Sequence, residues 1–282
     1  MFKVVSNEEV APQVHRLVVE APRVAAARRA GQFVIVHASQ GAERIPLTIA
    51  DADRNAGTIT LIVQAVGPGT REIVAVAPGG TIRDVAGPLG RPTEIEKVGK
   101  VVCIGGGVGT AVLLPLAKAL AEAGNNVTTI IGGRSAPQVI LRDEMASFCT
   151  EVLVTTEDGS LGIRGFVTKA LEEILTDPAR RPAAVFAVGP VPMMAAVCEQ
   201  TRPHGIRTIV SLNPIMVDGT GMCGGCRVTV GGQIQFACVD GPEFDGHAVD
   251  FQELAERQNA YNEDRCRLHE ARIARTTPGG SE

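Results

Sequence analysis

The chain between residues 100 and 212 consists of short apolar runs that alternate with segments of helical pattern. The runs that we expect to form strands cover residues 101–105, 127–132, 151–156, 183–189 and 208–212. The helices expected between them cover residues 110–123, 138–149, 165–175 and 192–202. Continuous apolar strands that alternate with helices are typical of a parallel sheet covered on both faces. The pattern therefore predicts a doubly wound, parallel-sheet α/β domain, which we place at residues 98–212.

A glycine-rich stretch, Gly105-Gly106-Gly107-Val108-Gly109-Thr110, separates the first of these strands from the first helix. A nucleotide pyrophosphate binds at such a position, against bare backbone and a helix N-terminus. The sixth position is Thr110 rather than Gly, so the stretch also fits a tight turn without a ligand. We predict that Gly106, Gly107, Gly109 and Thr110 bind a nucleotide.

Residues 1–97 contain short β-branched runs separated by Gly and Pro, and we expect a small β-barrel there. The expected strands are 14–20, 32–38, 45–50, 58–65 and 81–86, with a short helix at 71–76. Two stretches carry candidate chemistry, Arg44-Ile45-Pro46-Leu47-Thr48 and Gly67-Pro68-Gly69-Thr70. A guanidinium suits phosphate oxygens, and glycines let backbone N–H groups approach an anion. Each stretch by itself also fits a surface ion pair or an ordinary turn.

Four potential metal ligands, Asp218, Cys223, Cys226 and Cys238, lie in the last third of the chain. Four residues separate the first two, two residues separate the next two, and eleven precede Cys238. With Asp in the first position, this is the plant-type spacing of 2Fe–2S ligands. A hairpin of residues 228–230 and 233–237 would carry the chain back to Cys238. A zinc knuckle, buried cysteines without metal, or an Asp218 that lies only near the cluster are the alternatives.

The net charge of −4 and the pI near 5.8 do not indicate binding to nucleic acid or to an anionic membrane. The N-terminus lacks a signal-peptide pattern, and no apolar run reaches the length of a membrane span. We therefore expect a cytoplasmic protein that has neither a nucleic acid nor a membrane as partner. Residues 251–274 form a charged pattern that predicts a last helix, which is either a solvated face or a partner surface.

These motifs together resemble the ferredoxin–NADP reductase superfamily, in which the barrel binds FAD and the α/β domain binds the nicotinamide nucleotide. The resemblance implies FAD contacts from the barrel residues Arg44, Pro46, Leu47, Thr48, Val63, Gln64, Gly67, Gly69 and Thr70. It implies NAD(H) or NADP(H) contacts, beyond the glycine-rich stretch, from Arg134, Glu157, Asp158, Gly189, Pro190 and Met193. Thr48, Gly189 and Pro190 would align the two ring systems, and no side chain need act as an acid or base. The choice between NADH and NADPH stays open.

The order of barrel, nucleotide domain and C-terminal 2Fe–2S module (residues 213–282) resembles the electron-transfer subunits of dihydroorotate dehydrogenase. It resembles more closely the small subunits of NADH-dependent reduced ferredoxin:NADP oxidoreductases, of the sulfide dehydrogenase beta subunit type. In that group the cluster is thought to take one Asp and three Cys, which fits Asp218, Cys223, Cys226 and Cys238.

This resemblance implies an electron-transfer flavoprotein subunit. It would move a hydride between NAD(P)H and FAD, and single electrons through the cluster to a larger partner with another flavin and 4Fe–4S clusters. Electron bifurcation in that heterodimer is implied as well. The rival hypotheses are a dihydroorotate electron-transfer subunit, a stand-alone ferredoxin reductase, and a non-redox regulatory module that binds a nucleotide and zinc.

Overall fold

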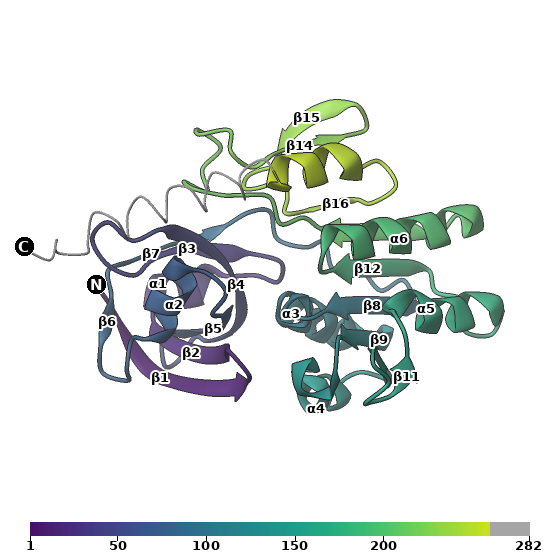
Figure 1. The fold of residues 1–282 in the computed structure, drawn as a ribbon, viewed down its shortest axis with the longest axis horizontal. Helices are drawn as coiled ribbons and strands as arrows, with labels where there is room; N and C mark the ends of the chain where they lie inside the picture. The colour runs from purple at the N-terminus through teal and green to yellow at the C-terminus, as the bar shows by residue number, and fades with distance from the viewer. Residues whose placement is uncertain (260–282) are drawn as a thin grey trace, which may run out of the picture.

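A computed structural model of the chain describes residues 1–259. Within these residues, two seven-stranded sheets and a two-stranded hairpin define three parts of the fold (Figure 1). The N-terminal barrel and the second sheet lie side by side, and the hairpin with the segments around it lies across both (Figure 1). This arrangement confirms the predicted fold class of a β-barrel followed by a parallel α/β sheet. None of the helices in residues 1–259 is both long and apolar enough to cross a membrane.

The first sheet is antiparallel and has the order β6-β1-β2-β5-β4-β3-β7. Its strands are β1 (Phe2–Ala11), β2 (Val14–Glu20), β3 (Phe33–His37), β4 (Arg44–Asp53), β5 (Thr58–Gln64), β6 (Thr81–Ile82) and β7 (Asp84–Leu89). Only Arg83 separates the two edge strands β6 and β7, so the edges meet and the sheet nearly closes on itself. Alternate side chains of the strands point inward, among them Leu17, Val34 and Leu61, and form the barrel core.

The structure differs from the sequence predictions in three parts of the barrel. The predicted strand 81–86 is two strands, because the Arg83 N–H donates to the Ala38 carbonyl oxygen and the chain turns there. Strand β1 was not predicted, since half of its residues are exposed and it lacks a run of apolar side chains. Helix α1 (Pro22–Ala27) was also missed, because six residues are too few for a helical period to show. The predicted helix 71–76 is α2 (Pro68–Val74).

The second sheet has the order β11-β10-β9-β8-β12-β13-β16 and is parallel except for its last strand. Its strands are β8 (Lys100–Gly106), β9 (Asn126–Gly133), β10 (Glu151–Thr156), β11 (Ile163–Arg164), β12 (Ala184–Val188), β13 (Arg207–Ser211) and β16 (Glu243–Asp245). Strand β16 comes from the last third of the chain and pairs antiparallel with β13. The sheet that sequence analysis placed in the middle of the chain is therefore completed by a strand from beyond the cysteine motif.

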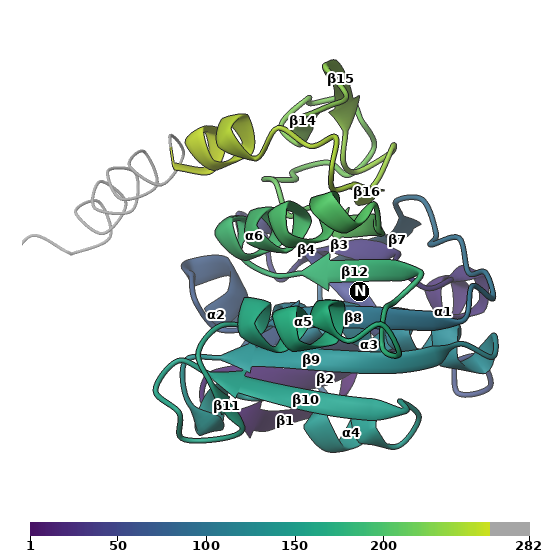
Figure 2. The same ribbon diagram turned by 90° about the vertical axis from the view of Figure 1, so that its right-hand side faces the viewer.

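Helices cover both faces of the second sheet (Figure 2). Helix α3 (Gly109–Glu122) and Met145 of α4 (Arg142–Ala146) pack on one face. Helices α5 (Val167–Thr176) and α6 (Val191–Thr201) pack on the other. Two short 3-10 helices, η1 (Ala136–Gln138) and η2 (Arg202–His204), complete these connections.

The prediction of one helix over residues 138–149 was wrong. After η1 the chain is extended, and α4 begins only beyond Leu141, whose φ of 60° is left-handed. Leu141 and Ile140 are buried against Val14 and Ile62 of the barrel. Packing against the barrel thus selects a local backbone conformation that the helical pattern does not favour.

The C-terminal part contains the predicted hairpin, as β14 (Arg227–Val230) and β15 (Gln233–Phe236). Residues 251–259 are helical, and the rest of the helix predicted at 251–274 lies outside the described residues. Cys226 and Cys238 share one buried cluster with Phe33 and Ile35 of the barrel and Val210 of the second sheet. The three parts therefore meet in a common core next to the cysteine motif.

Candidate functional site

The loop that joins Asp218 to Cys226 owes its shape to three glycines in the left-handed region. Gly219, Gly221 and Gly224 have φ values of 74°, 85° and 68°. Any other residue would be strained at these positions. A Cβ on Gly219 would also lie 2.6 Å from Leu89 Cδ1, so the loop lies directly against the barrel.

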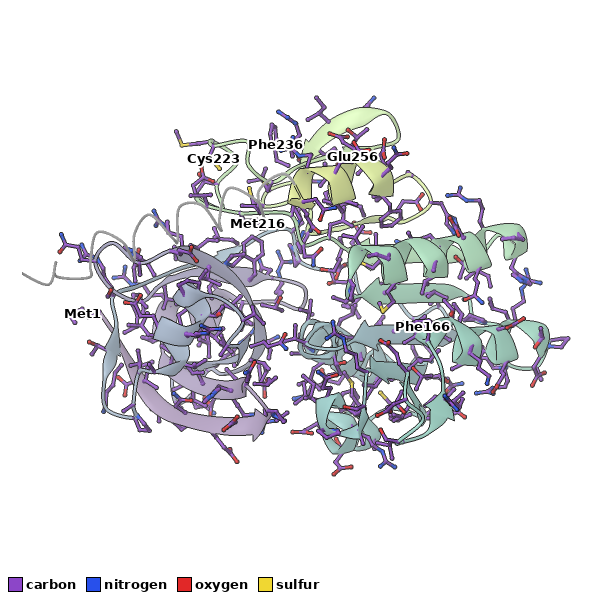
Figure 3. The ribbon with its side chains drawn as sticks, viewed as in Figure 1. Met1, Phe166, Met216, Cys223, Phe236 and Glu256 are labelled. Atoms are coloured by element: carbon purple, nitrogen blue, oxygen red, sulfur yellow. The ribbon has the colours of Figure 1, made fainter. Side chains whose placement is uncertain are left out.

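The four predicted metal ligands form two pairs. Cys226 and Cys238 are each 1% exposed, and their Sγ atoms lie 3.2 Å apart. Asp218 lies beside the exposed Cys223, whose N–H donates to Asp218 Oδ2 at 2.8 Å. Figure 3 shows Cys223 toward the outside of the segment that lies above the barrel. Among residues 1–259, no three histidine, cysteine or carboxylate side chains gather as a cage for a single metal ion.

The electrostatics of the two pairs differ. Burial raises the pKa of the Cys238 thiol to about 12, and the neighbouring Cys226 sulfur adds to the shift. The N–H of Thr220, helped by that of Cys223, lowers the pKa of Asp218 below its usual value. Ligands bind metal in their ionised form, so the buried pair needs a bound cation while Asp218 is already charged. Two pairs of donors, three from this loop and Cys238 from beyond the hairpin, fit a two-iron cluster, in which each iron takes two protein ligands.

The two candidate flavin motifs of the barrel lie side by side. A Cβ on Gly69 would lie 2.9 Å from Glu43 Oε2 and 3.0 Å from Ile45 Cδ1, so the first turn of α2 packs against the start of β4. The Thr70 hydroxyl oxygen accepts the Gly67 N–H at 3.0 Å and so fixes this turn. Arg44 is partly exposed, and its Nη2 lies 3.9 Å from Asp84 Oδ2.

The other predicted barrel residues differ in how deeply they are buried. Leu47 and Thr48 are half-buried on β4, where they pair with Val34 and Phe33 of β3. Pro46 lies between them and Arg44 on the same strand. Gln64 is half-buried at the end of β5. Val63, however, is fully buried in the barrel core, so it can reach a ligand only through its backbone.

The glycine-rich turn and the Gly189-Pro190 segment meet at the carboxyl ends of β8 and β12. A Cβ on Gly109 would lie 2.4 Å from the Val188 carbonyl oxygen, and one on Gly106 would lie 2.5 Å from Met193 Sδ. These glycines are needed for the close approach of the two segments. Thr110 is fully buried at the start of α3, and its hydroxyl has no hydrogen-bond partner within the described residues. A glycine-rich turn at a helix start fits a nucleotide phosphate.

Arg134, Glu157 and Asp158 also come together, at the ends of β9 and β10. The Glu157 N–H donates to the Gly133 carbonyl oxygen at 3.1 Å, and the Asp158 N–H donates to that of Arg134 at 3.2 Å. All three side chains are exposed. The Ser160 hydroxyl donates to Asp158 Oδ1 at 2.6 Å and lowers the pKa of that carboxyl group. This edge of the sheet therefore presents both positive and negative side chains to solvent.

Two features near these motifs were not expected from the sequence. Glu243 on β16 is mostly buried at the junction of the three parts, although no pattern around it marks a buried carboxyl group. His247 has Nε2 within 3.0 Å of the buried Thr201 hydroxyl. A cavity of ≈ 500 Å³ lies away from the motifs, between α6, the hairpin turn and residues 248–251.

Comparison with known families identifies two of the three parts. Residues 103–199 match the model of the oxidoreductase NAD-binding domain. Residues 213–250 match the iron–sulfur cluster binding domain of dihydroorotate dehydrogenase B. The first match contains the glycine-rich turn, and the second contains Asp218, Cys223, Cys226 and Cys238.

Curated relatives cover nearly the whole chain. The "dihydroorotate dehydrogenase B (NAD(+)), electron transfer subunit homolog" of Thermotoga maritima is 47% identical over 93% of this chain and 92% of its own length. The electron transfer subunit of the same enzyme from Streptococcus pneumoniae is 35% identical over 86% of this chain and 95% of its own length. This chain belongs to the family of dihydroorotate dehydrogenase B electron transfer subunits and their homologues.

A solved structure is similar over the same extent. It is described as the structure of NADH-dependent reduced ferredoxin-NADP oxidoreductase, which gives insights into flavin-based electron bifurcation. One of its chains is 45% identical and matches 97% of this chain and 98% of its own length with a TM-score of 0.90. The comparisons confirm the resemblance, the class of NAD-linked oxidoreductase subunit, and the predicted FAD, 2Fe–2S and nicotinamide cofactors.

Proposed function

We propose that this chain passes electrons between a nicotinamide nucleotide and a larger partner subunit that carries another flavin and 4Fe–4S clusters. The observation that carries the proposal is the likeness, over 97% of the chain, to a chain of NADH-dependent reduced ferredoxin-NADP oxidoreductase. We further propose that the complex carries out flavin-based electron bifurcation, as the description of that structure says of its own enzyme.

The surface around the cysteine loop supports a partner at this point. Met222 is 89% exposed, Val217 49% and Val239 37%, and all three lie in or next to the loop. A Cβ on Gly221 would lie 3.1 Å from the Val239 side chain, which shows how closely that residue lies to the loop. Apolar side chains that gather on a surface commonly mark a protein contact. We propose that the partner covers these residues and thereby approaches the half-buried Asp218 and the exposed Cys223.

The roles of the predicted residues follow from their positions. We propose Asp218, Cys223, Cys226 and Cys238 as the four cluster ligands. When bound, the nicotinamide and flavin supply hydride transfer and the cluster supplies single-electron transfer. The protein binds and aligns them. The turn at Gly106–Thr110 and the Gly189-Pro190 segment hold the nucleotide, while Arg44–Thr48 and Gly67–Thr70 hold the flavin.

A second candidate is the electron-transfer subunit of a dihydroorotate dehydrogenase. The match of residues 213–250 to the iron–sulfur domain of that enzyme favours it, as do the names of the curated relatives. The two candidates share cofactors and differ in the partner. The identity of the partner therefore decides between them.

The test is anaerobic purification from the native source with partners retained, followed by analysis of iron, sulfide and flavin. We expect about two irons and one FAD in this chain and an electron paramagnetic resonance signal of a reduced 2Fe–2S cluster. A larger partner with flavin and 4Fe–4S clusters would support the proposal. Co-purification of a dihydroorotate-oxidising protein would favour the second candidate. Zinc in place of iron, without flavin, would contradict both.

A further inference from the structure

Glu243 lies where the three parts of the molecule meet. It is the first residue of β16, the edge strand that the C-terminal part adds to the second sheet. Its Oε1 accepts a hydrogen bond from the Thr93 hydroxyl at 2.7 Å. Thr93 belongs to residues 91–98, which we call the connector because they join the barrel to the second sheet; the connector passes close to β16 (Figure 1).

The barrel contacts the same point. The Thr93 N–H donates to the Ala30 carbonyl oxygen at 2.9 Å. A Cβ on Gly31 would lie 2.2 Å from the Thr93 hydroxyl oxygen and 3.2 Å from Glu243 Oε1. Close to the carboxyl group, the Arg91 N–H donates to the Gly241 carbonyl oxygen at 2.7 Å. The Glu243 side chain is therefore enclosed by the barrel, the connector and its own strand.

No cation within the described residues compensates a charge on this carboxyl group. Glu243 forms none of the ion pairs of residues 1–259. Arg28 pairs with Asp51, Arg91 with Asp240, and Glu96 with Arg207. The other titratable or charged groups on the surrounding elements are Arg29, Glu94, Lys97, Cys103 and Asp245, and the end of the Lys97 side chain lies near Gly124. An ionised carboxylate enclosed without a cation is unfavourable, because it loses hydration without gaining a partner.

We propose that Glu243 is a proton-controlled clamp, whose neutral carboxyl group keeps the barrel, the connector and β16 together and whose proton is released to solvent when this junction opens. The Glu243 carboxyl group is neutral in the closed junction and becomes a hydrated carboxylate when the junction opens. Opening therefore becomes easier as the pH rises. Burial raises the pKa of Glu243 from 4.5 to about 7, and the Thr93 hydrogen bond acts in the opposite direction. The free energy of opening the junction therefore falls as the pH rises from about 4.5 to 7, and the junction opens most readily above that range.

The test measures hydrogen exchange of the Arg91 and Thr93 amides at several pH values, in the full-length chain with its cofactors bound. The exchange rates are expressed as protection factors, which correct for the intrinsic pH dependence of amide exchange. In the wild type we expect them to fall by up to about tenfold per pH unit between pH 5 and 7, because opening releases one proton. Glu243→Gln, which cannot ionise, should give pH-independent protection of both amides. Glu96→Gln is the matched control on the connector and should keep the wild-type slope.

A flat profile in the wild type would overturn the proposal, and so would a slope that persists in Glu243→Gln. If Glu243→Gln does not fold, Thr93→Val provides the second test. It removes the hydrogen bond that favours the ionised form, so the Glu243 pKa measured by carbon-13 NMR should move upward. An unchanged or lowered pKa in Thr93→Val would also overturn the proposal. None of these outcomes depends on the partner or on electron transfer.

Discussion

The two glycine-rich segments of the molecule, residues 105–110 and 218–226, use glycine for different reasons. In the nucleotide turn, Gly106 and Gly109 are required because other protein atoms occupy the space of a Cβ. In the cluster loop, Gly221 and Gly224 are required by their left-handed backbone, while the nearest atoms to a Cβ on Gly224 lie 3.8 Å away. The first segment is shaped mainly by packing against the rest of the domain. In the second segment a left-handed backbone is common to Gly219, Gly221 and Gly224, and a Cβ on Gly219 would in addition lie 2.6 Å from Leu89 Cδ1 of the barrel.

The largest effect should come from removing a buried ligand of the cluster loop. Cys226→Ser should reduce the iron content from about two per chain to nearly none, because the buried pair then lacks one thiolate. Iron and sulfide analysis of the anaerobically purified protein measures this loss. Cys198→Ser, at another buried cysteine on α6, is the control and should retain the iron. Full iron content in Cys226→Ser would remove this residue from the ligand set.

Asp218 and Cys223, the other two predicted ligands, should show a graded response. Cys223→Ser should also lose the cluster, and Asp218→Ala should lose most of its iron if the carboxylate is a ligand. Asp218→Cys should keep the cluster and shift its reduction potential, because a thiolate is a softer donor than a carboxylate. Potentiometric titration measures the shift. Normal iron content in Asp218→Ala, together with loss in Cys223→Ser, would show that Asp218 only lies near the cluster.

In the nucleotide turn, the largest loss should be one of folding stability. Gly109→Ala places a Cβ 2.4 Å from the Val188 carbonyl oxygen and should lower the free energy of unfolding by about 3 kcal/mol. Gly107→Ala, at a position with open space and a φ of 55°, should cost only about 1 kcal/mol. Urea denaturation measures both variants. Equal losses would show that backbone conformation, and not packing, shapes this turn as well.

Glu243, at the junction of the barrel, the connector and β16, gives the next largest effect. In the folded state its pKa is about 7, above its usual 4.5, so the folded protein retains a proton that the unfolded chain releases. The corresponding stability is fully present below about pH 4.5 and is lost as the pH rises to about 7. Glu243→Gln should remove this slope, and at pH 8 it should exceed the wild-type stability by about 2 to 3 kcal/mol. Urea denaturation of both proteins from pH 4 to 8 measures the difference. Stabilities of the wild type and Glu243→Gln that change equally with pH would contradict the raised pKa.

The smallest effect should come from the ion pair of Arg16 on β2 with Glu144 on α4, which joins the barrel to the nucleotide domain. Both side chains are partly exposed, so Arg16→Ala should cost less than about 1 kcal/mol. Denaturation at low and high salt measures the change, and Arg180→Ala, which removes a similar surface pair with Glu151, is the matched control. A loss well above that of the control would show that this contact, and not only apolar packing, holds the two parts together.

The sequence by itself determined the order and the type of the main elements. The apolar runs of the second sheet are continuous because both faces are buried, and this made β8, β9, β10, β12 and β13 predictable. The spacing of Asp218, Cys223, Cys226 and Cys238, and the turn before Thr110, were visible because such motifs need donors and glycines at fixed separations. These features depend on residues that are close together in the chain, so they can be predicted from the sequence.

Only the tertiary structure decided which distant segments meet. Strand β16 joins the second sheet because its backbone completes the edge of β13, and no sequence period marks its three residues. Leu141 takes a left-handed conformation because the barrel buries it, against the preference of its own segment. The Glu243 carboxyl group is enclosed by Gly31 and Thr93, which lie at least 150 residues away in the chain. Contacts over such separations depend on the geometry of the whole fold, because burial and hydrogen bonding are fixed only when the three parts pack together.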